Sequence, residues 1–98
     1  MLDAIERIES YTHNMDGKTF EKDLKTIDAV IRQMEVLGEA AGQIPAGLVK
    51  DSPVPWGFVT GMRHKLIHDY MGVDVKIVWK TASSELQPLK KYLTKKIK

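Results

Sequence analysis

The side chains best suited to chemistry lie together in residues 61–70, which read GMRHKLIHDY. Two of the three histidines of the chain stand here beside an arginine and a tyrosine. The segment is predicted to be helical, and a helix advances about 100° per residue. Arg63 and Tyr70 therefore return to nearly the same side of the helix. His64 and His68 form a neighbouring pair one turn apart.

A separate apolar stripe on the same helix indicates which side faces the core. Val59, Met62 and Leu66 recur at helical spacing, on a different azimuth from the two histidines. We therefore expect the histidine pair to project away from the core. An ionisable group held off the core on a rigid element suits a functional site.

These residue types fit phosphodiester chemistry on RNA. A histidine can remove or donate a proton near neutral pH, and a guanidinium can hold a phosphate oxygen and oppose developing negative charge. A tyrosine can hydrogen-bond to a phosphate or stack on a base. If the 2′-hydroxyl of the substrate attacks, no metal is required, and the sequence contains no cluster of carboxylates suited to a metal pair.

Other interpretations of the same residues remain open. Histidines on the polar face of a helix are often only solvated, and an arginine with a tyrosine two turns later is a common packing pair. His64 and His68 have the spacing of a zinc-binding pair, but no third ligand stands nearby, and His13 is the only other histidine. We expect no metal site and no cofactor.

The composition indicates one soluble globular domain over residues 1–98, with 43% apolar and 29% charged residues. No apolar run approaches the length of a membrane span. The first residues lack the basic start and cleavage site of a signal peptide. Cysteine is absent, so neither disulfides nor cysteine zinc sites are expected. A cytoplasmic location is predicted.

The formal net charge of +2 conceals an asymmetry between the two halves of the chain. Residues 1–44 hold nine acidic and five basic residues, a net of −4, whereas residues 45–98 hold four acidic and ten basic residues, a net of +6. A lysine-rich end can attract a polyanion, although it is also compatible with simple solvation and with the helix dipole. The closing lysines are Lys90, Lys91, Lys95, Lys96 and Lys98.

Apolar periodicity predicts two helices in the first half of the chain. The first covers about residues 2–14. The second is long, begins at Asp16 or Thr19, either of which can cap it, and runs to Ile44 before Pro45. Its apolar positions are Phe20, Leu24, Ile27, Ile31, Met34, Leu37, Ala41 and Ile44.

Turn residues over 46–55 predict a loop, after which Trp56 opens the helix that carries residues 61–70. Asp74 is a suitable N-cap for a further helix. Pro88 lies inside its periodic pattern and should kink or restart it. The predicted fold is therefore an all-α bundle of four helices, or five if Pro88 breaks the last one.

A homodimer is expected, because a bundle of this size leaves apolar surface uncovered. The wide stripe of the second helix would be better buried in a two-fold contact than exposed. Four methionines are available as adaptable contacts: Met15, Met34, Met62 and Met71.

The spacing of Arg63, His68 and Tyr70 resembles the R-x4-6-H-x-Y motif of the HEPN superfamily, and specifically the HepT-like toxin family. The flanking residues agree with this resemblance, in the right order and over nearly the whole chain. These flanks are Ala29-Val30, Gly38-Glu39-Ala40, Pro55-Trp56 and Val78-Trp79.

This resemblance implies an HEPN-type bundle that dimerises through its motif-bearing region. It also implies a metal-independent endoribonuclease that acts as the toxin of a type VII toxin–antitoxin pair. His68 would be the acid/base residue and Arg63 the contact to the phosphate or transition state. His64 would help to orient the site, and Glu39 would be a further contributor.

The resemblance further implies a partner, an MntA-like minimal nucleotidyltransferase antitoxin, and leaves a larger hetero-oligomer open. This enzyme would neutralise the toxin by adenylylating Tyr70. The chain departs from the family pattern in a short amino terminus and in having His64 where Asn or Asp is usual. The competing class is a non-catalytic all-α dimer that only binds a partner or RNA.

Overall fold

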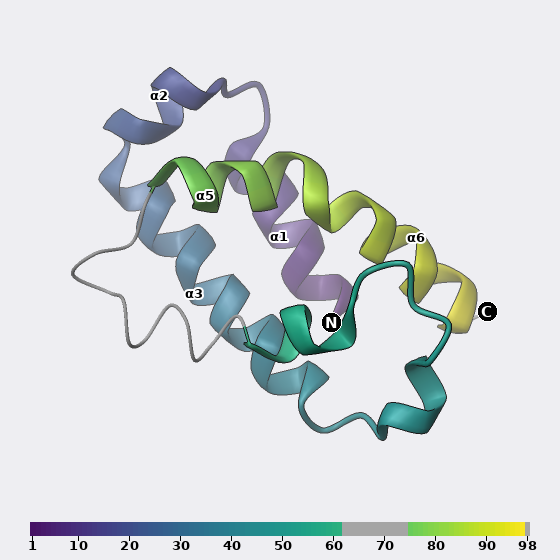
Figure 1. The fold of residues 1–98 in the computed structure, drawn as a ribbon. Helices are drawn as coiled ribbons and strands as arrows, with labels where there is room; N and C mark the ends of the chain where they lie inside the picture. The colour runs from purple at the N-terminus through teal and green to yellow at the C-terminus, as the bar shows by residue number, and fades with distance from the viewer. Residues whose placement is uncertain (62–74, 98) are drawn as a thin grey trace.

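The computed structural model describes residues 1–61 and 75–97. All regular elements in these two ranges are helical, so the predicted all-α class is confirmed (Figure 1). Residues 56–61 form one of them. The others are α1 (Leu2–Thr12), α2 (Gly17–Lys22), α3 (Leu24–Ala41), the 3-10 helix η1 (Ala46–Val49), α5 (Val75–Lys80), the π-helix η3 (Thr81–Glu85) and α6 (Leu86–Ile97).

Helix α1 begins and ends close to the predicted positions. Its apolar residues Ala4, Ile5 and Ile8 are buried, as the period of the sequence requires. Beyond the helix, Asn14 adopts a φ of 63°, a left-handed conformation that asparagine tolerates better than most residues. The chain turns there and enters α2 at the N-cap Asp16, whose side chain accepts a hydrogen bond from the backbone of Thr19.

The prediction of one long second helix is wrong, because the chain breaks at Asp23 into α2 and α3. Asp23 leaves helical geometry, with φ −104° and ψ 88°. Its carboxylate instead accepts hydrogen bonds from the backbone N–H of Thr26 at 3.1 Å and from the hydroxyl of Thr26 at 2.8 Å. Such a cap competes with helix continuation. Leu24, expected in the apolar stripe, is consequently 73% exposed.

Helix α3 also ends earlier than predicted, at Ala41 rather than Ile44. The backbone N–H of Gly42 donates to the carbonyl of Gly38 at 3.1 Å, and that of Ile44 donates to the carbonyl of Ala41 at 3.2 Å. These bonds close the last turn before Pro45 can stop the helix. The segment predicted as a loop then contains η1.

The last long helical pattern is interrupted by the π-helix η3 and restarts at α6, as Pro88 predicted. The backbone N–H of Leu86 donates to the carbonyl of Thr81, five residues earlier. Pro88 thus lies in the first turn of α6, where the missing N–H has little cost. The wider turn at η3 was not predicted.

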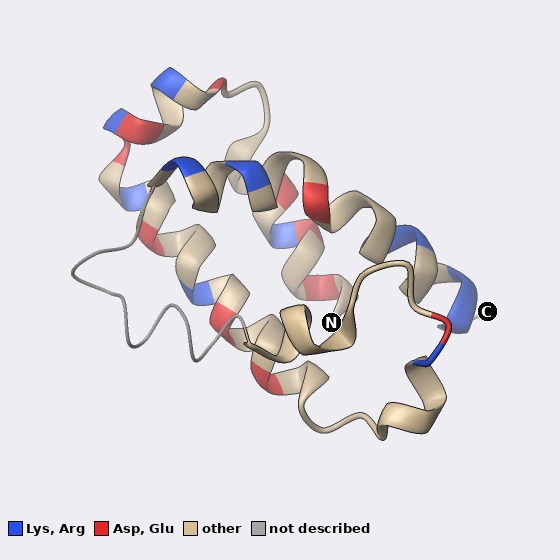
Figure 2. Ribbon diagram, in the orientation of Figure 1, with Lys and Arg blue, Asp and Glu red and all other residues tan. Residues whose placement is uncertain are grey.

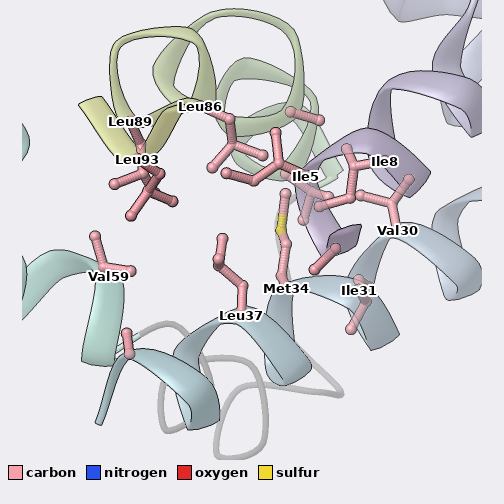
Figure 3. Packing of buried hydrophobic residues seen from close by; sticks show 14 of the residues in the cluster. Ile5, Ile8, Val30, Ile31, Met34, Leu37, Val59, Leu86, Leu89 and Leu93 are labelled. Carbon is pink, nitrogen blue, oxygen red and sulfur yellow. The ribbon is translucent and has the colours of Figure 1, made fainter. Parts of the chain in front are cut away.

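The core lies between α1, α3 and α6, with α2 and α5 packed at one end (Figures 1 and 3). At that end the ring centroids of Phe20 and Trp79 are 5.1 Å apart. Met34 is 2% exposed within the single chain, so it is not available for the dimer contact that the sequence analysis expected. The largest fully buried side chains are Phe20, Ile5, Ile8, Leu37, Leu86, Leu89, Val30 and Val59.

Two leucines of α3 test the break at Asp23. Leu37 is fully buried, whereas Leu24 is 73% exposed. Leu37→Ala is expected to lower the free energy of unfolding by about 2–5 kcal/mol, because it leaves a cavity. Leu24→Ala should change it by no more than about 0.5 kcal/mol. Urea denaturation of both variants measures the difference, and equal losses would contradict the exposed position of Leu24.

Candidate functional site

Four of the five predicted site residues fall outside the residues that the structure describes: Arg63, His64, His68 and Tyr70. Met62 and Leu66, predicted on the core-facing stripe of the same helix, and Asp74, the predicted N-cap, lie outside them as well. What the structure does describe is the helix that leads into this segment, α5 that follows it, and Glu39 on α3.

The helix that leads into the motif begins at Trp56, as predicted. The carbonyl of Pro55 accepts hydrogen bonds from the backbone of Phe58 at 3.0 Å and of Val59 at 3.4 Å, which starts the helix. Val59 is fully buried, and Figure 3 shows it facing Leu89 and Leu93 of α6. The predicted core-facing direction is therefore confirmed at Val59.

The indole of Trp56 fixes the start of this helix to the end of α3. Its Nε1–H donates to the carbonyl of Ala41 at 3.2 Å. The carbonyls in the last turn of a helix lack partners within the helix. The Ala41 carbonyl already accepts from the backbone N–H of Ile44, so the indole is its second donor. The sequence placed Trp56 at a helix start but gave no sign of its acceptor, which stands 15 residues earlier.

The segment between α3 and Trp56 is held to the carboxyl end of α6. The hydroxyl of Tyr92 donates to Asp51 Oδ1 at 2.6 Å, and Lys96 Nζ lies 3.5 Å from the same oxygen. The hydrogen bond from Tyr92 lowers the pKa of the Asp51 carboxyl. Burial, followed by the bond to Asp51, raises the pKa of the Tyr92 phenol. This contact fixes the connection that precedes the helix at residues 56–61.

Glu39, the one predicted site residue within the described ranges, is exposed in the last turn of α3. Among the described residues no cation lies within ion-pairing distance of its carboxylate. A negative charge at the carboxyl end of a helix opposes the helix dipole. Glu39 therefore contributes no evident stability to its own chain, which is compatible with a role towards another group.

A second polar cluster, which the sequence analysis did not predict, lies between α1 and α6. Lys90 Nζ is 2.7 Å from Glu9 Oε1, and Gln87 Nε2 donates to Glu9 Oε2 at 3.3 Å. The bond from Lys90 lowers the pKa of Glu9, and the same pairing raises the pKa of Lys90. Glu9 and Lys90, together with Glu6, Ser10 and His13, border an open depression of about 430 Å³. The pair mainly joins the two helices.

Within residues 1–61 and 75–97, no three His, Cys, Asp or Glu side chains are grouped to hold a metal ion. In the same ranges no helix combines the length and hydropathy that a membrane crossing requires.

Comparison with known protein families matches residues 1–95 to the family described as "Ribonuclease HepT-like". The chain belongs to this family. The resemblance inferred from the motif and its flanks is thereby confirmed, and the match covers the segment that contains Arg63, His68 and Tyr70.

Curated relatives of this HepT-like chain carry ribonuclease names. "Probable ribonuclease HepT" of Thermococcus cleftensis is 44% identical over 92% of the chain and 83% of its own length. "Putative RNase MJ1216" of Methanocaldococcus jannaschii is 39% identical over 100% of the chain and 82% of its own length. "Putative RNase TTE0752" of Caldanaerobacter subterraneus subsp. tengcongensis is 39% identical over 89% of the chain and 81% of its own length. No solved structure matches the chain.

Removing the indole donor of Trp56 should loosen the helix that leads into the motif. Trp56→Phe is expected to lower the free energy of unfolding by about 0.5–1.5 kcal/mol. The loss should fall near the lower end, since the Ala41 carbonyl keeps its bond from Ile44. Amide hydrogen exchange should accelerate at Val59 and Gly61 but not at Leu37, the internal control. Unchanged exchange at residues 59–61 would show that the bond does not hold this helix.

Proposed function

We propose that this HepT-like protein is a metal-independent endoribonuclease whose catalytic residues are His68 and Arg63. The observation that carries the proposal is the family match over residues 1–95, together with the Arg63-x4-His68-x-Tyr70 spacing inside it. The names of the relatives support the same substrate class.

The proposed reaction uses a hydroxyl of the substrate as the nucleophile. The 2′-oxygen forms a bond to phosphorus as the bond from phosphorus to the 5′-oxygen breaks. His68 transfers the proton, and the products are a 2′,3′-cyclic phosphate and a free 5′-hydroxyl. Arg63 opposes the charge that develops on the phosphoryl oxygens. His64, Tyr70 and Glu39 are proposed as supporting residues.

We further propose that the active species is a homodimer in which the two motif regions meet. Arg63 and His68 are expected to lie about 140° apart on one helix, so a partner subunit can supply the missing half of a site. The residues on either side of the motif support this arrangement. Phe58 is 40% exposed before the segment and Ile77 is 50% exposed after it, and a two-fold contact would cover them.

The biological role proposed is that of a toxin in a type VII toxin–antitoxin pair, formed by the single domain of residues 1–98 in the cytoplasm, where its RNA substrates are. An MntA-like nucleotidyltransferase would add AMP to Tyr70 within a hetero-oligomer of the two proteins. The transferred nucleotide adds negative charge and bulk on the expected side of Arg63, where a substrate phosphate would bind. Modification would thus exclude RNA by charge and by size.

The role of His68 can be tested against a matched histidine. His68→Ala is expected to lower the rate of RNA cleavage by about 10²–10⁴-fold, the usual contribution of a general acid or base. His13→Ala, an exposed histidine at the end of α1, should leave the rate unchanged. Cleavage by the wild type should persist in EDTA. If His68→Ala cleaves RNA as fast as the wild type, His68 is not the catalytic residue. If the wild type binds RNA but does not cleave it, the protein is a binding module instead of this enzyme.

Adenylylation can be measured by intact mass. After incubation with the cognate nucleotidyltransferase and ATP, the wild type should gain the mass of AMP and lose ribonuclease activity. Tyr70→Phe should gain none, whereas Tyr11→Phe should be modified like the wild type. A gain that survives Tyr70→Phe would assign the modification to another residue.

A further inference from the structure

Helix α6 presents a basic face that the core does not use. The helix contains no aspartate or glutamate. Lys91 and Lys95 are exposed and stand one turn apart, on the side of the helix opposite to its buried leucines. Figure 2 shows basic residues gathered toward the carboxyl end of this helix. The buried residues on the other side are Leu86, Leu89, Tyr92 and Leu93.

The other two described lysines of α6 are engaged within the chain. Lys90 pairs with Glu9 at 2.7 Å, and Lys96 lies 3.5 Å from Asp51. The nitrogen of Lys96 also stands 5.6 Å from the ring centroid of Tyr92. These two lysines therefore have structural partners on other elements.

Lys91 and Lys95 differ in this respect. Across the described ranges, no carboxylate lies within 4.0 Å of either ammonium group. Like charges one turn apart destabilise a helix. The helix dipole compensates Lys95 in the last turn but not Lys91. A neutral polar residue at either position would avoid this repulsion, so the two lysines do not serve the stability of the helix. Binding of an anion from outside the chain explains their presence better.

We infer that Lys91 and Lys95 form a contact for the phosphate backbone of single-stranded RNA, independent of sequence and separate from the motif segment. The inference rests on the proposed function for the identity of the polyanion. Two ammonium groups on flexible stems suit phosphates of variable position. A protein partner is a poorer match, because lysine is depleted at protein interfaces and the exposed neighbours Gln87 and Pro88 offer no apolar anchor.

Helix α2 offers a matched control pair. Lys18 and Lys22 are exposed with the same one-turn spacing, but they stand among acidic residues, so the local charge is balanced. Figures 1 and 2 show α2, which carries both signs of charge, far from the carboxyl end of α6. The acidic residues around this control pair are Asp16, Glu21 and Asp23.

The test is the salt dependence of RNA binding, measured by fluorescence anisotropy with a labelled single-stranded RNA of mixed sequence. All variants carry His68→Ala, so that the probe stays intact and binding is read independently of cleavage. Each phosphate contact on a single strand contributes about 0.7 to the slope of log affinity against log salt. Lys91→Gln with Lys95→Gln should lower that slope by about 1.4. Lys18→Gln with Lys22→Gln should leave it unchanged.

A comparison of two adjacent residues sharpens the result. Lys91→Gln alone should lower the slope by about 0.7, whereas Lys90→Gln should lower it much less, since Lys90 is held by Glu9. Circular dichroism confirms that the variants are folded. An equal slope for the α6 double variant and its parent overturns the inference, as does a protein that binds no RNA, even if Lys91 and Lys95 prove to bind the antitoxin. A reduced slope for the α6 double variant supports the inference. This holds even if the wild-type protein, which retains His68, cleaves no RNA and the proposed enzymatic function fails.

Discussion

Burial of the facing leucine and isoleucine side chains of α1, α3 and α6 is the constraint on which the rest of the structure depends. Ile5, Leu37 and Leu89 are fully buried. Removing such side chains from water is the main favourable term in folding a bundle of this size. Val59 joins the same cluster from the helix at 56–61. The position of residues 56–61, directly before the motif, is therefore set by the core itself.

Polar contacts then fix what apolar burial leaves undetermined. Hydrophobic packing is non-directional, whereas the bond from Trp56 to the Ala41 carbonyl specifies one position for a helix start. The contact between Tyr92 and Asp51 holds the preceding connection in the same way. Both contacts involve the approach to the motif and neither involves a motif residue. The proposed ribonuclease site of this chain would thus depend on contacts made by residues outside the motif.

The charge distribution separates stability from recognition. Lys90 and Lys96 serve contacts between elements, whereas Lys91 and Lys95 have no such partners in the described part of the chain. On α3, Glu39 is likewise exposed against the helix dipole. Groups of this kind are informative because the folded chain gains little from them. A surface that follows an RNA backbone on α6 would raise affinity without requiring any change at the motif.

The sequence by itself determined the helical class, the family and the order of the motif residues, because these depend on local periodicity and on spacing along the chain. It also located the helix start at Trp56 and the restart near Pro88. Arg63, His64, His68 and Tyr70 remain predictions from the motif, and only Glu39 is placed. The tertiary structure decided the break at Asp23, where a side-chain cap prevails over an apolar period that continues through it. It also decided which lysines are paired, since Lys90 meets Glu9 and Lys96 meets Asp51 only in the folded chain. The hydrogen bonds to the same two carboxylates, from Gln87 to Glu9 and from Tyr92 to Asp51, span 78 and 41 residues. Such partners meet only when the core brings their helices together, and no local pattern encodes that meeting.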